Sequence, residues 1–241
     1  EIGLGIPAEP LFRSCLVEVI PGTEEADLSF LGATSIVRRD VEAPYLVVDL
    51  GGGSTELVLG GDGVTKPVTQ VQAAFSMNIG SVRMTERHLR NDPPTEAQID
   101  EAIQDIDEHI DEAFRTVPAG KARTIIGVSG TVTTMTALSM GLTEYDHSVV
   151  DGARCTLEDA FAVDDRFLRM PREERLTYKT IHPGRVDVVG GGALVWSRVL
   201  ARVSEAAQAD HGQAIDSFMA SEHGLLDGIV LDYGTRLLAA R

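Results

Sequence analysis

Residues 45–60 are YLVVDLGGGSTELVLG, in which two short apolar runs flank three consecutive glycines. The first run, 45–48, is rich in β-branched residues, and the second, 56–59, follows the glycine loop directly. Runs of this kind predict buried strands, so we expect a strand–loop–strand hairpin. A dinucleotide-binding fingerprint and a Walker loop each need a helix after the glycines, and the hairpin therefore argues against both.

The loop of this hairpin carries groups that suit a phosphate. Glycine has no Cβ, so the backbone amides can approach a ligand closely and form an anion-binding nest, to which two hydroxyls are added. The predicted phosphate contacts are Gly51, Gly52, Gly53, Ser54 and Thr55. Asp49 and Glu56 bracket the loop and would place two oxygen ligands where Mg²⁺ could bridge to a phosphate. The alternative is a glycine-rich turn with two solvated acids, but the flanking Asp and Ser-Thr-Glu favour phosphoryl chemistry.

The composition limits the class of protein. With 241 residues, 43% of them apolar, the chain can bury the core of one large domain or two small ones. A formal net charge of −16 argues against broad binding to nucleic acid or membrane surfaces, and no apolar stretch approaches the roughly 18 residues of a membrane span. We expect a cytoplasmic protein. Cys15 and Cys155 are far apart and lack metal-ligand spacing, which predicts neither a disulfide nor a zinc site.

Two acidic residues, Glu24 and Glu25, fall in the first turn of a helix expected from Thr23, its N-cap, to about Leu31. The helix dipole stabilises carboxylates at this position, which is a sufficient structural explanation for both. The functional alternative is that one of them is a general base. Residues 17–20, before this helix, are a candidate strand.

A second candidate anion site follows another buried strand. Residues 123–129, RTIIGVS, predict this strand, and Gly130-Thr131 leads from it into a helix that ends near Gly141. The amides of Gly130 and Thr131 would point from the helix N-terminus toward the crevice at the carboxyl end of the strand. A plain strand–turn–helix connection explains the segment equally well.

A third candidate is the Gly80-Ser81 turn, which follows a strand expected within 64–74 and precedes a short basic helix. The basic stretch is either a solvated helix face or marks a turn, Gly80-Ser81, that faces an anion.

The remaining pattern is mainly helical. Thr95 and Gln98 predict a capping box at the start of the clearest helix, whose apolar stripe extends to Val117 and whose acidic face is explained by solvation. The glycines at 190–192 are expected within a long helix, where they permit close packing. The other expected elements are helices at 157–169, 172–179 and 221–238 and a short strand or connector at 214–220.

Five motifs together resemble the exopolyphosphatase and guanosine pentaphosphate phosphohydrolase (Ppx/GppA) family. In order, they are GTEEADLSF, DLGGGSTE, GVSGTVTT, HPGRVDVVGGGA and SEHGLLDGI. The similarity runs from about Val17 to Leu231 and looks closest to the actinobacterial exopolyphosphatase branch. It implies the fold of the actin, sugar kinase and Hsp70 ATPase superfamily: an α/β, ribonuclease-H-like lobe with a mixed sheet flanked by helices.

The resemblance also implies a domain organisation. Residues 19–241 would form a C-terminal ribonuclease-H-like lobe with a helical insertion and C-terminal helices. Residues 1–18 would be the irregular remnant of an N-terminal lobe, because the Asp-x-Gly-x-Asn/Ser phosphate loop with which family members begin does not occur in residues 1–20.

Carried over position by position, the resemblance implies specific roles. Glu25 would be the catalytic carboxylate that activates the attacking water. Asp49, Gly51 and Glu56 would form the loop that binds metal and phosphate, and Asp49 would also be a catalytic residue. The expected cofactor is Mg²⁺. The second phosphate-side turn would be Gly130 and Thr131.

The expected reaction is hydrolysis of the terminal phosphoanhydride of inorganic polyphosphate, which releases phosphate. Removal of the 5′ γ-phosphate of guanosine pentaphosphate breaks the same kind of bond and is the second enzymatic hypothesis. A non-catalytic phosphate- or nucleotide-binding lobe is the alternative from another class. The expected partners are therefore one of these polyanions and, as an assembly, a homodimer, with no nucleic acid and no membrane.

Overall fold

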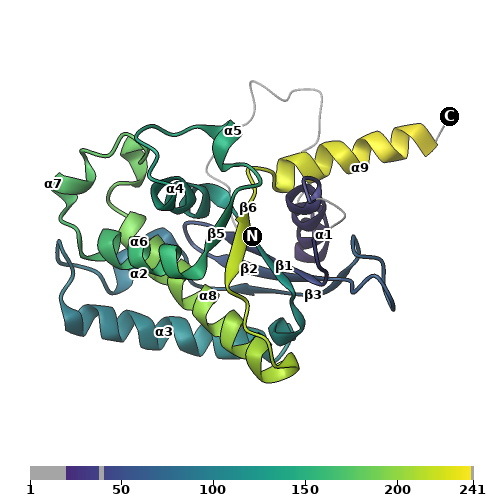
Figure 1. The fold of residues 1–241 in the computed structure, drawn as a ribbon, viewed down its shortest axis with the longest axis horizontal. Coiled ribbons are helices and arrows are strands. Elements are labelled where there is room, and N and C mark those ends of the chain that lie inside the picture. Colours follow the sequence, from purple (N-terminus) through teal and green to yellow (C-terminus); the bar gives the residue numbers. More distant parts are fainter. Residues whose placement is uncertain (1–19, 38–40, 240–241) are drawn as a thin grey trace.

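The computed structural model describes residues 20–37 and 41–239, which are built around a six-stranded mixed sheet (Figure 1). The strands are β1 (Tyr45–Leu50), β2 (Thr55–Gly60), β3 (Val71–Met77), β4 (Thr124–Val128), β5 (Arg154–Thr156) and β6 (Ser217–Ala220). Their order across the sheet is β3-β2-β1-β4-β6-β5. The first three form an antiparallel meander, β4 and β6 continue parallel to β1, and β5 is antiparallel to β6. The predicted hairpin and α/β architecture are confirmed.

The central strand, β1, is buried on both faces. Leu46 and Val48 belong to the larger hydrophobic core, whereas Tyr45 and Val47 belong to a smaller core on the opposite side. This division arises because successive side chains of a strand point to opposite faces. A strand with a parallel neighbour and helices on both faces needs a continuous apolar run, which explains why this segment shows no polar alternation.

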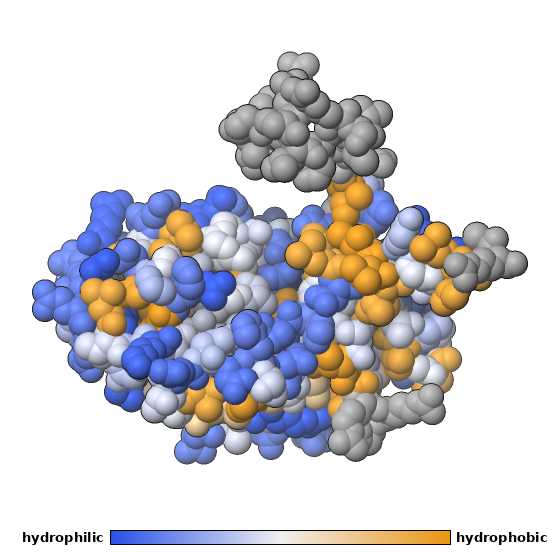
Figure 2. All heavy atoms as spheres, turned by 90° about the horizontal axis from the view of Figure 1, so that it is seen from above, coloured by the Kyte–Doolittle hydropathy of each residue, from blue (hydrophilic) through white to orange (hydrophobic). Residues whose placement is uncertain are grey.

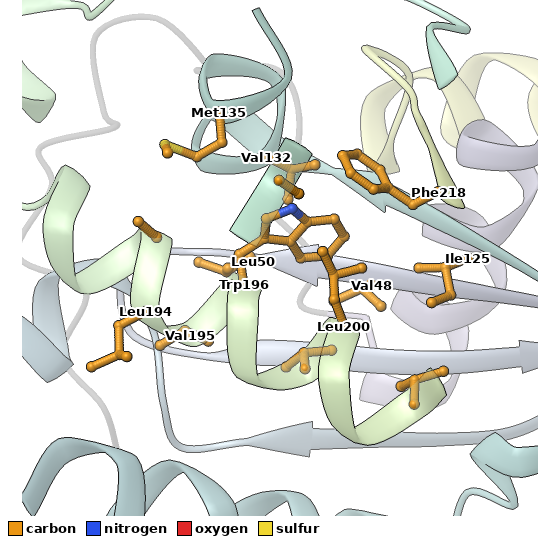
Figure 3. Close-up of a cluster of buried hydrophobic side chains, with 14 of the residues drawn as sticks. Val48, Leu50, Ile125, Val132, Met135, Leu194, Val195, Trp196, Leu200 and Phe218 are labelled. Atoms are coloured by element: carbon orange, nitrogen blue, oxygen red, sulfur yellow. The ribbon is translucent and has the colours of Figure 1, made fainter. Parts of the chain in front are cut away.

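The larger core is formed between the sheet and most of the helices. These are α2 (Ser81–Arg87), α3 (Glu96–Phe114), α4 (Ser129–Ser139), α6 (Leu157–Arg169) and α8 (Val189–His211), with the short α5 (His147–Val150) and α7 (Arg172–Arg175) at the periphery. Trp196 of α8 is fully buried at the centre, where its ring meets Phe218 of β6 edge-on with the centroids 5.1 Å apart (Figure 3). Val132 of α4 lies beside the same indole (Figure 3).

The opposite face of the sheet is covered by α1 (Gly22–Thr34), and α9 (Leu225–Ala239) packs on α1 (Figure 1). The two helices cross at such short range that a Cβ built on Gly228 would lie 1.8 Å from the carbonyl oxygen of Leu28. The outer side of α9 is apolar and exposed, with Leu226 77% and Val230 70% accessible. Figure 2 looks onto this side and shows hydrophobic residues gathered over its right half. None of the helices in the described part of the chain has the length and hydropathy needed to cross a bilayer.

The starts of the first helix and of the third strand differ from the sequence-based expectations for identifiable reasons. The first helix begins at Gly22 with the extended Pro21 in the N-cap position, so Thr23 is not its cap. The third strand begins at Val71 because the side chain of Asp62 accepts hydrogen bonds from three following amides and holds the preceding segment in a turn.

Three predicted helical features and one of the two cysteines can be located in the structure. The capping box between Thr95 and Gln98 is confirmed, as is a helix over 157–169. The helix expected at 172–179 is wrong beyond its first turn, since it ends at Arg175. Cys155 is a buried free thiol, whereas Cys15, residues 17–19 of the candidate strand and the whole of the expected N-terminal remnant, 1–18, lie outside the described residues.

Candidate active site

Two parallel neighbouring strands, β1 and β4, end at the same edge of the sheet. Their register continues to the pair Asp49 and Val128. Beyond it, the hydroxyl of Ser129 donates a hydrogen bond of 2.6 Å to the carbonyl oxygen of Leu50. The glycine loop after β1 and the turn after β4 therefore lie side by side, where one ligand could contact both.

The turn after β4 opens α4 and has a strained backbone. Ser129 has a φ of +81°, and among residues 20–37 and 41–239 no other non-glycine residue has a positive φ. Such conformations are costly for a residue with a Cβ and persist mainly at functional sites. The first amides of a helix have no acceptor within that helix, so those of Gly130 and Thr131 remain available at this edge. The side chain of Thr131 packs against Gly192 of α8, which leaves its backbone as the group that can contact a ligand.

Two carboxylates flank the glycine loop on the other side. Asp49 of β1 and Glu56 of β2 are directly paired in the antiparallel register, which places their side chains on the same face. Burial, together with the charge of Glu56, raises the pKa of Asp49 to about 6. A long hydrogen bond of 3.4 Å from the Ser29 hydroxyl to Asp49 Oδ2 opposes this rise only in part. The pair is thus a site of unbalanced negative charge.

Glu25 lies at the same edge of the sheet. It precedes Ser29 by one turn of α1, and residues four apart share a helix face. Its charge also contributes to the raised pKa of Asp49. Glu25 is exposed to solvent, so its carboxylate can contact water. The structure therefore brings together three acidic residues that the sequence singled out: Glu25, Asp49 and Glu56.

These carboxylates fit a cation that completes its coordination with other oxygens. Within the described ranges, no group of three or more His, Cys, Asp or Glu side chains is arranged to hold a metal by itself. Mg²⁺ commonly binds through one or two carboxylates and takes its remaining ligands from water and substrate phosphates. The opposed, partly buried pair of Asp49 and Glu56 meets that requirement, because a divalent cation would relieve their repulsion.

The glycine loop is held rigidly, and this changes which of its groups are available. The Gly51 amide donates to the Ser54 carbonyl at 2.9 Å, so it does not join the nest that the sequence suggested. The amides of Gly52 and Gly53 have no acceptor among the residues described by the structure. Thr55 is also engaged, because its buried hydroxyl donates to the Ile79 carbonyl at 2.8 Å. We therefore retain Gly52, Gly53 and Ser54 as the candidate phosphate contacts of this loop.

The Gly80-Ser81 turn is not a separate anion site. The Ser81 amide donates to the Gly51 carbonyl at 3.0 Å, and the Val82 and Arg83 amides donate to the Gly52 carbonyl at 2.9 and 3.0 Å. The N-terminal amides of α2 are thus satisfied by the glycine loop. Their function is to fix the loop, and the hypothesis that they face an anion is wrong.

Comparisons with known proteins identify the family of this chain. The model of the Ppx/GppA phosphatase family matches residues 12–233. The chain belongs to this family. It is 43% identical over 214 residues to exopolyphosphatase 2 of Mycobacterium tuberculosis, which covers 89% of this chain and 63% of that protein. The chain therefore spans less than two thirds of the length of this curated relative.

Solved structures of Ppx/GppA proteins show the same fold. An exopolyphosphatase-like protein is 82% identical with a TM-score of 0.90, over 93% of this chain and 70% of that chain. The Aquifex aeolicus Ppx/GppA enzyme is 29% identical with a TM-score of 0.74, over 90% of this chain and 66% of the other. These matches confirm the ribonuclease-H-like fold that the resemblance implied.

Two arginines that were not among the predicted site residues contact the two glycine-containing turns, the loop after β1 and the turn after β4. A Cβ on Gly53 would lie 3.3 Å from Nη2 of Arg83. Arg185, in a 3₁₀ turn at Pro183–Arg185, donates from Nη1 to the Gly130 carbonyl at 3.3 Å. Arg83 belongs to the basic stretch noted in the sequence, and Arg185 belongs to the motif HPGRVDVVGGGA. This motif could have indicated that Arg185 belongs to the site, but it could not predict the contact of Arg185 with Gly130.

A pocket of about 430 Å³ opens beside Gly130 in this Ppx/GppA lobe. Its lining comes from α4, α5, the segment before Arg185 and the end of β6: Ser129, Gly130, Thr133, Thr134, Tyr145, His147, Lys179, Thr180, His182, Pro183, Arg185 and Glu222. Its volume lies within the range of small-molecule sites. The side chain of His147 is 78% exposed at the rim of this pocket.

Proposed function

We propose that the full-length protein containing this chain hydrolyses the terminal phosphoanhydride of inorganic polyphosphate and releases phosphate. The observation that carries the proposal is the pairing of Asp49 with Glu56 beside two adjacent turns with free amides. The name of the relative exopolyphosphatase 2 supports polyphosphate as the substrate. Since the chain spans 63% of that relative, the activity is assigned to the full-length protein.

Asp49 and Glu56 are the proposed ligands of Mg²⁺. When bound, the cation neutralises charge on the phosphate oxygens of the reacting group. The chain itself contributes fixed hydrogen-bond donors, namely the amides of Gly52 and Gly53. These donors are preorganised because the loop carbonyls are already bonded to α2, so they need not reorient as charge develops.

Glu25 is the proposed general base. The carboxylate takes a proton from water as the water oxygen forms a bond to phosphorus and the bond to the bridging oxygen of the remaining chain breaks. Its exposure allows contact with water, and its position one turn before Ser29 places it close to Asp49. Complementing the dipole of α1 is the alternative role of Glu25, and it requires no chemistry.

The turn after β4 and the two arginines complete the proposed anion site. The amides of Gly130 and Thr131 would donate to phosphate oxygens, as expected for a helix N-terminus. Arg83 and Arg185 add fixed positive charge on either side. They offset the unfavourable field of a chain whose net charge is −16.

The alternatives are separated by phosphate release from the full-length protein, measured with polyphosphate and with guanosine pentaphosphate in Mg²⁺ and in chelator. The proposal expects release from polyphosphate that requires the cation and is lost in the Asp49→Asn, Glu56→Gln double variant. Release from guanosine pentaphosphate alone would favour the nucleotide hydrolase. Binding of either polyanion with no release would favour a non-catalytic binding lobe.

A further inference from the structure

The pocket beside Gly130 differs in charge from the acidic edge of the site. Its lining contains Arg185 and Lys179, two histidines, and a single acidic side chain, Glu222. The other end of the proposed site carries three carboxylates, Glu25, Asp49 and Glu56, with Arg83 beside Gly53 of the same loop. A linear polyanion whose terminal phosphate binds a cation at these carboxylates could therefore place its following phosphates beside Arg185 and Lys179 of the pocket.

We propose that this pocket binds the part of the polyphosphate chain that lies beyond the phosphate being removed. The inference rests on the proposed function, and it assigns the pocket as the site that holds the remaining chain between successive hydrolytic steps. The pocket begins at Ser129 and Gly130, the same turn whose amides face the proposed phosphate site, so a chain can pass from one to the other without leaving the surface.

The acidic member of the lining is already satisfied within the protein. The Tyr145 hydroxyl donates to Glu222 Oε1, and His147 Nδ1 lies 3.4 Å from the same oxygen. Burial, together with the hydrogen bond to Glu222, raises the pKa of Tyr145, which keeps that hydroxyl protonated as a donor. The charge of Glu222 is therefore directed at these partners and repels a bound anion less than a free carboxylate would.

The cations of the pocket remain available to a ligand. Lys179 pairs with Glu144 at 2.9 Å, but both side chains are largely exposed, at 75% and 70%. Exposed ion pairs contribute little, so Lys179 can exchange Glu144 for a phosphate at small cost. Arg185 donates to the Gly130 carbonyl, and among residues 20–37 and 41–239 its other guanidinium N–H groups have no hydrogen-bond partner, so they can donate to phosphate oxygens.

The aromatic groups of the pocket favour a phosphate chain over a nucleoside. Tyr145 and His147 meet edge to face, with centroids 4.9 Å apart and planes at 81°. Because the two rings are nearly perpendicular, this pair cannot hold a nucleobase between parallel rings. The hydroxyls of Ser129, Thr134 and Thr180 already donate to backbone carbonyls. The groups of the lining that can recognise phosphate oxygens are therefore the side chains of Arg185 and Lys179.

The test compares Lys179→Met, Lys179→Arg and Lys121→Met in the full-length protein. Lys121 is an exposed lysine before the amino end of β4, at the edge of the sheet opposite to Gly130, so its variant controls for the loss of one charge. Thermal unfolding checks that all three variants are folded. KM and kcat are measured for long-chain polyphosphate, tripolyphosphate and guanosine pentaphosphate.

We expect Lys179→Met to raise KM for long chains about fivefold, the effect of one exposed phosphate contact, and by less than twofold for tripolyphosphate, with kcat nearly unchanged. The slope of log KM against log salt should also decrease by about one. Lys179→Arg should restore both values, and Lys121→Met should match the wild type.

Three results would overturn the inference. These are equal loss on short and long chains, loss confined to guanosine pentaphosphate, and a salt slope in Lys179→Met equal to that of the wild type. If the wild type releases no phosphate from any substrate, calorimetric binding of long-chain polyphosphate decides. Weaker binding by Lys179→Met than by Lys121→Met would then keep this site while the hydrolytic function fails, and equal binding would remove both.

Discussion

Asp49 and Glu56 face each other directly across the β1–β2 pair, and burial together with this proximity raises the pKa of Asp49 to about 6. Partial burial is the larger cause, the charge of Glu56 the second, and the hydrogen bond from Ser29 only partly compensates. A fold gains no stability from such a pair without a counter-ion. This pair beside a rigid glycine loop is the basis of the proposed Mg²⁺ site.

The first prediction concerns the stability of the metal-free protein. The folded-state pKa of Asp49 is raised, so the folded state binds this proton more tightly than the unfolded state, and stability is lost as pH rises from about 4 to about 6. Asp49→Asn removes this loss. In chelator at pH 8 we expect the variant to be more stable than the wild type by ~1–3 kcal/mol, measured by urea denaturation. Asp62→Asn, in an exposed turn, should show no such gain, and a less stable Asp49→Asn would contradict the account.

The second prediction concerns the stability of the protein in the presence of Mg²⁺. A ligand that binds only the folded state stabilises it in proportion to its saturation. Added Mg²⁺ should raise the melting temperature of the wild type and leave that of the Asp49→Asn, Glu56→Gln double variant unchanged. An equal rise in both proteins would place the cation elsewhere.

The third prediction concerns Asp164 in α6, which is fully buried without a hydrogen-bond partner for either oxygen among the described residues. Burial raises its pKa well above the ordinary value of 3.8, so its contribution to stability decreases as pH rises above about 4. Asp164→Asn should therefore gain stability over the wild type between pH 4 and pH 8, by up to about 1.4 kcal/mol per pH unit until the folded-state pKa is reached. Asp165→Asn, one residue along on the exposed side of the helix, is the control and should lack this trend. A constant difference across the pH range would show that Asp164 is not buried in this way.

The fourth prediction tests the crossing of α1 and α9. A Cβ on Gly228 would lie 1.8 Å from the Leu28 carbonyl oxygen, so Gly228→Ala must separate the helices and should destabilise the protein by about 1–3 kcal/mol. Gly234 lies in the same helix with nothing within 4 Å of a built Cβ. Gly234→Ala should stabilise the protein by up to ~1 kcal/mol through helix propensity. Similar effects of the two substitutions in thermal unfolding would contradict the crossing.

Local pattern was sufficient to predict the elements that hold the site. The apolar runs around the glycines predicted the hairpin, and the run before Gly130 predicted the strand that ends beside it. Strand alternation and helix capping are properties of neighbouring residues, so a single sequence contains them. The close packing expected of the glycines at 190–192 is confirmed, since a Cβ on Gly191 would lie 2.3 Å from Thr85 Oγ1.

What the sequence could not show is which groups of the site are already in use. The Thr55 hydroxyl is bonded to a carbonyl 24 residues away, and Arg185 reaches a carbonyl 55 residues away. The amides of α2 appeared free until the fold placed the carbonyls of Gly51 and Gly52 against them. Such contacts depend on how distant segments meet, and local propensity carries no information about them.

The remaining prediction separates two explanations for the acidic residues at the start of α1. If Glu25 activates water, Glu25→Gln removes an interaction that matters in the transition state, so kcat should fall by about 10²- to 10⁴-fold with little change in KM. Glu24→Gln removes the same charge from the same helical turn and is the matched control. If both residues only complement the helix dipole, each variant loses ~0.3–1 kcal/mol of stability and keeps its turnover.

The most direct measurement is phosphate release from long-chain polyphosphate by the full-length wild type, Glu25→Gln and Glu24→Gln proteins, side by side in Mg²⁺. We predict a large loss of kcat in Glu25→Gln and a rate within about twofold of the wild type in Glu24→Gln. Equal rates for Glu25→Gln and the wild type would contradict the proposal that this acidic edge is a hydrolytic centre with Glu25 as its base.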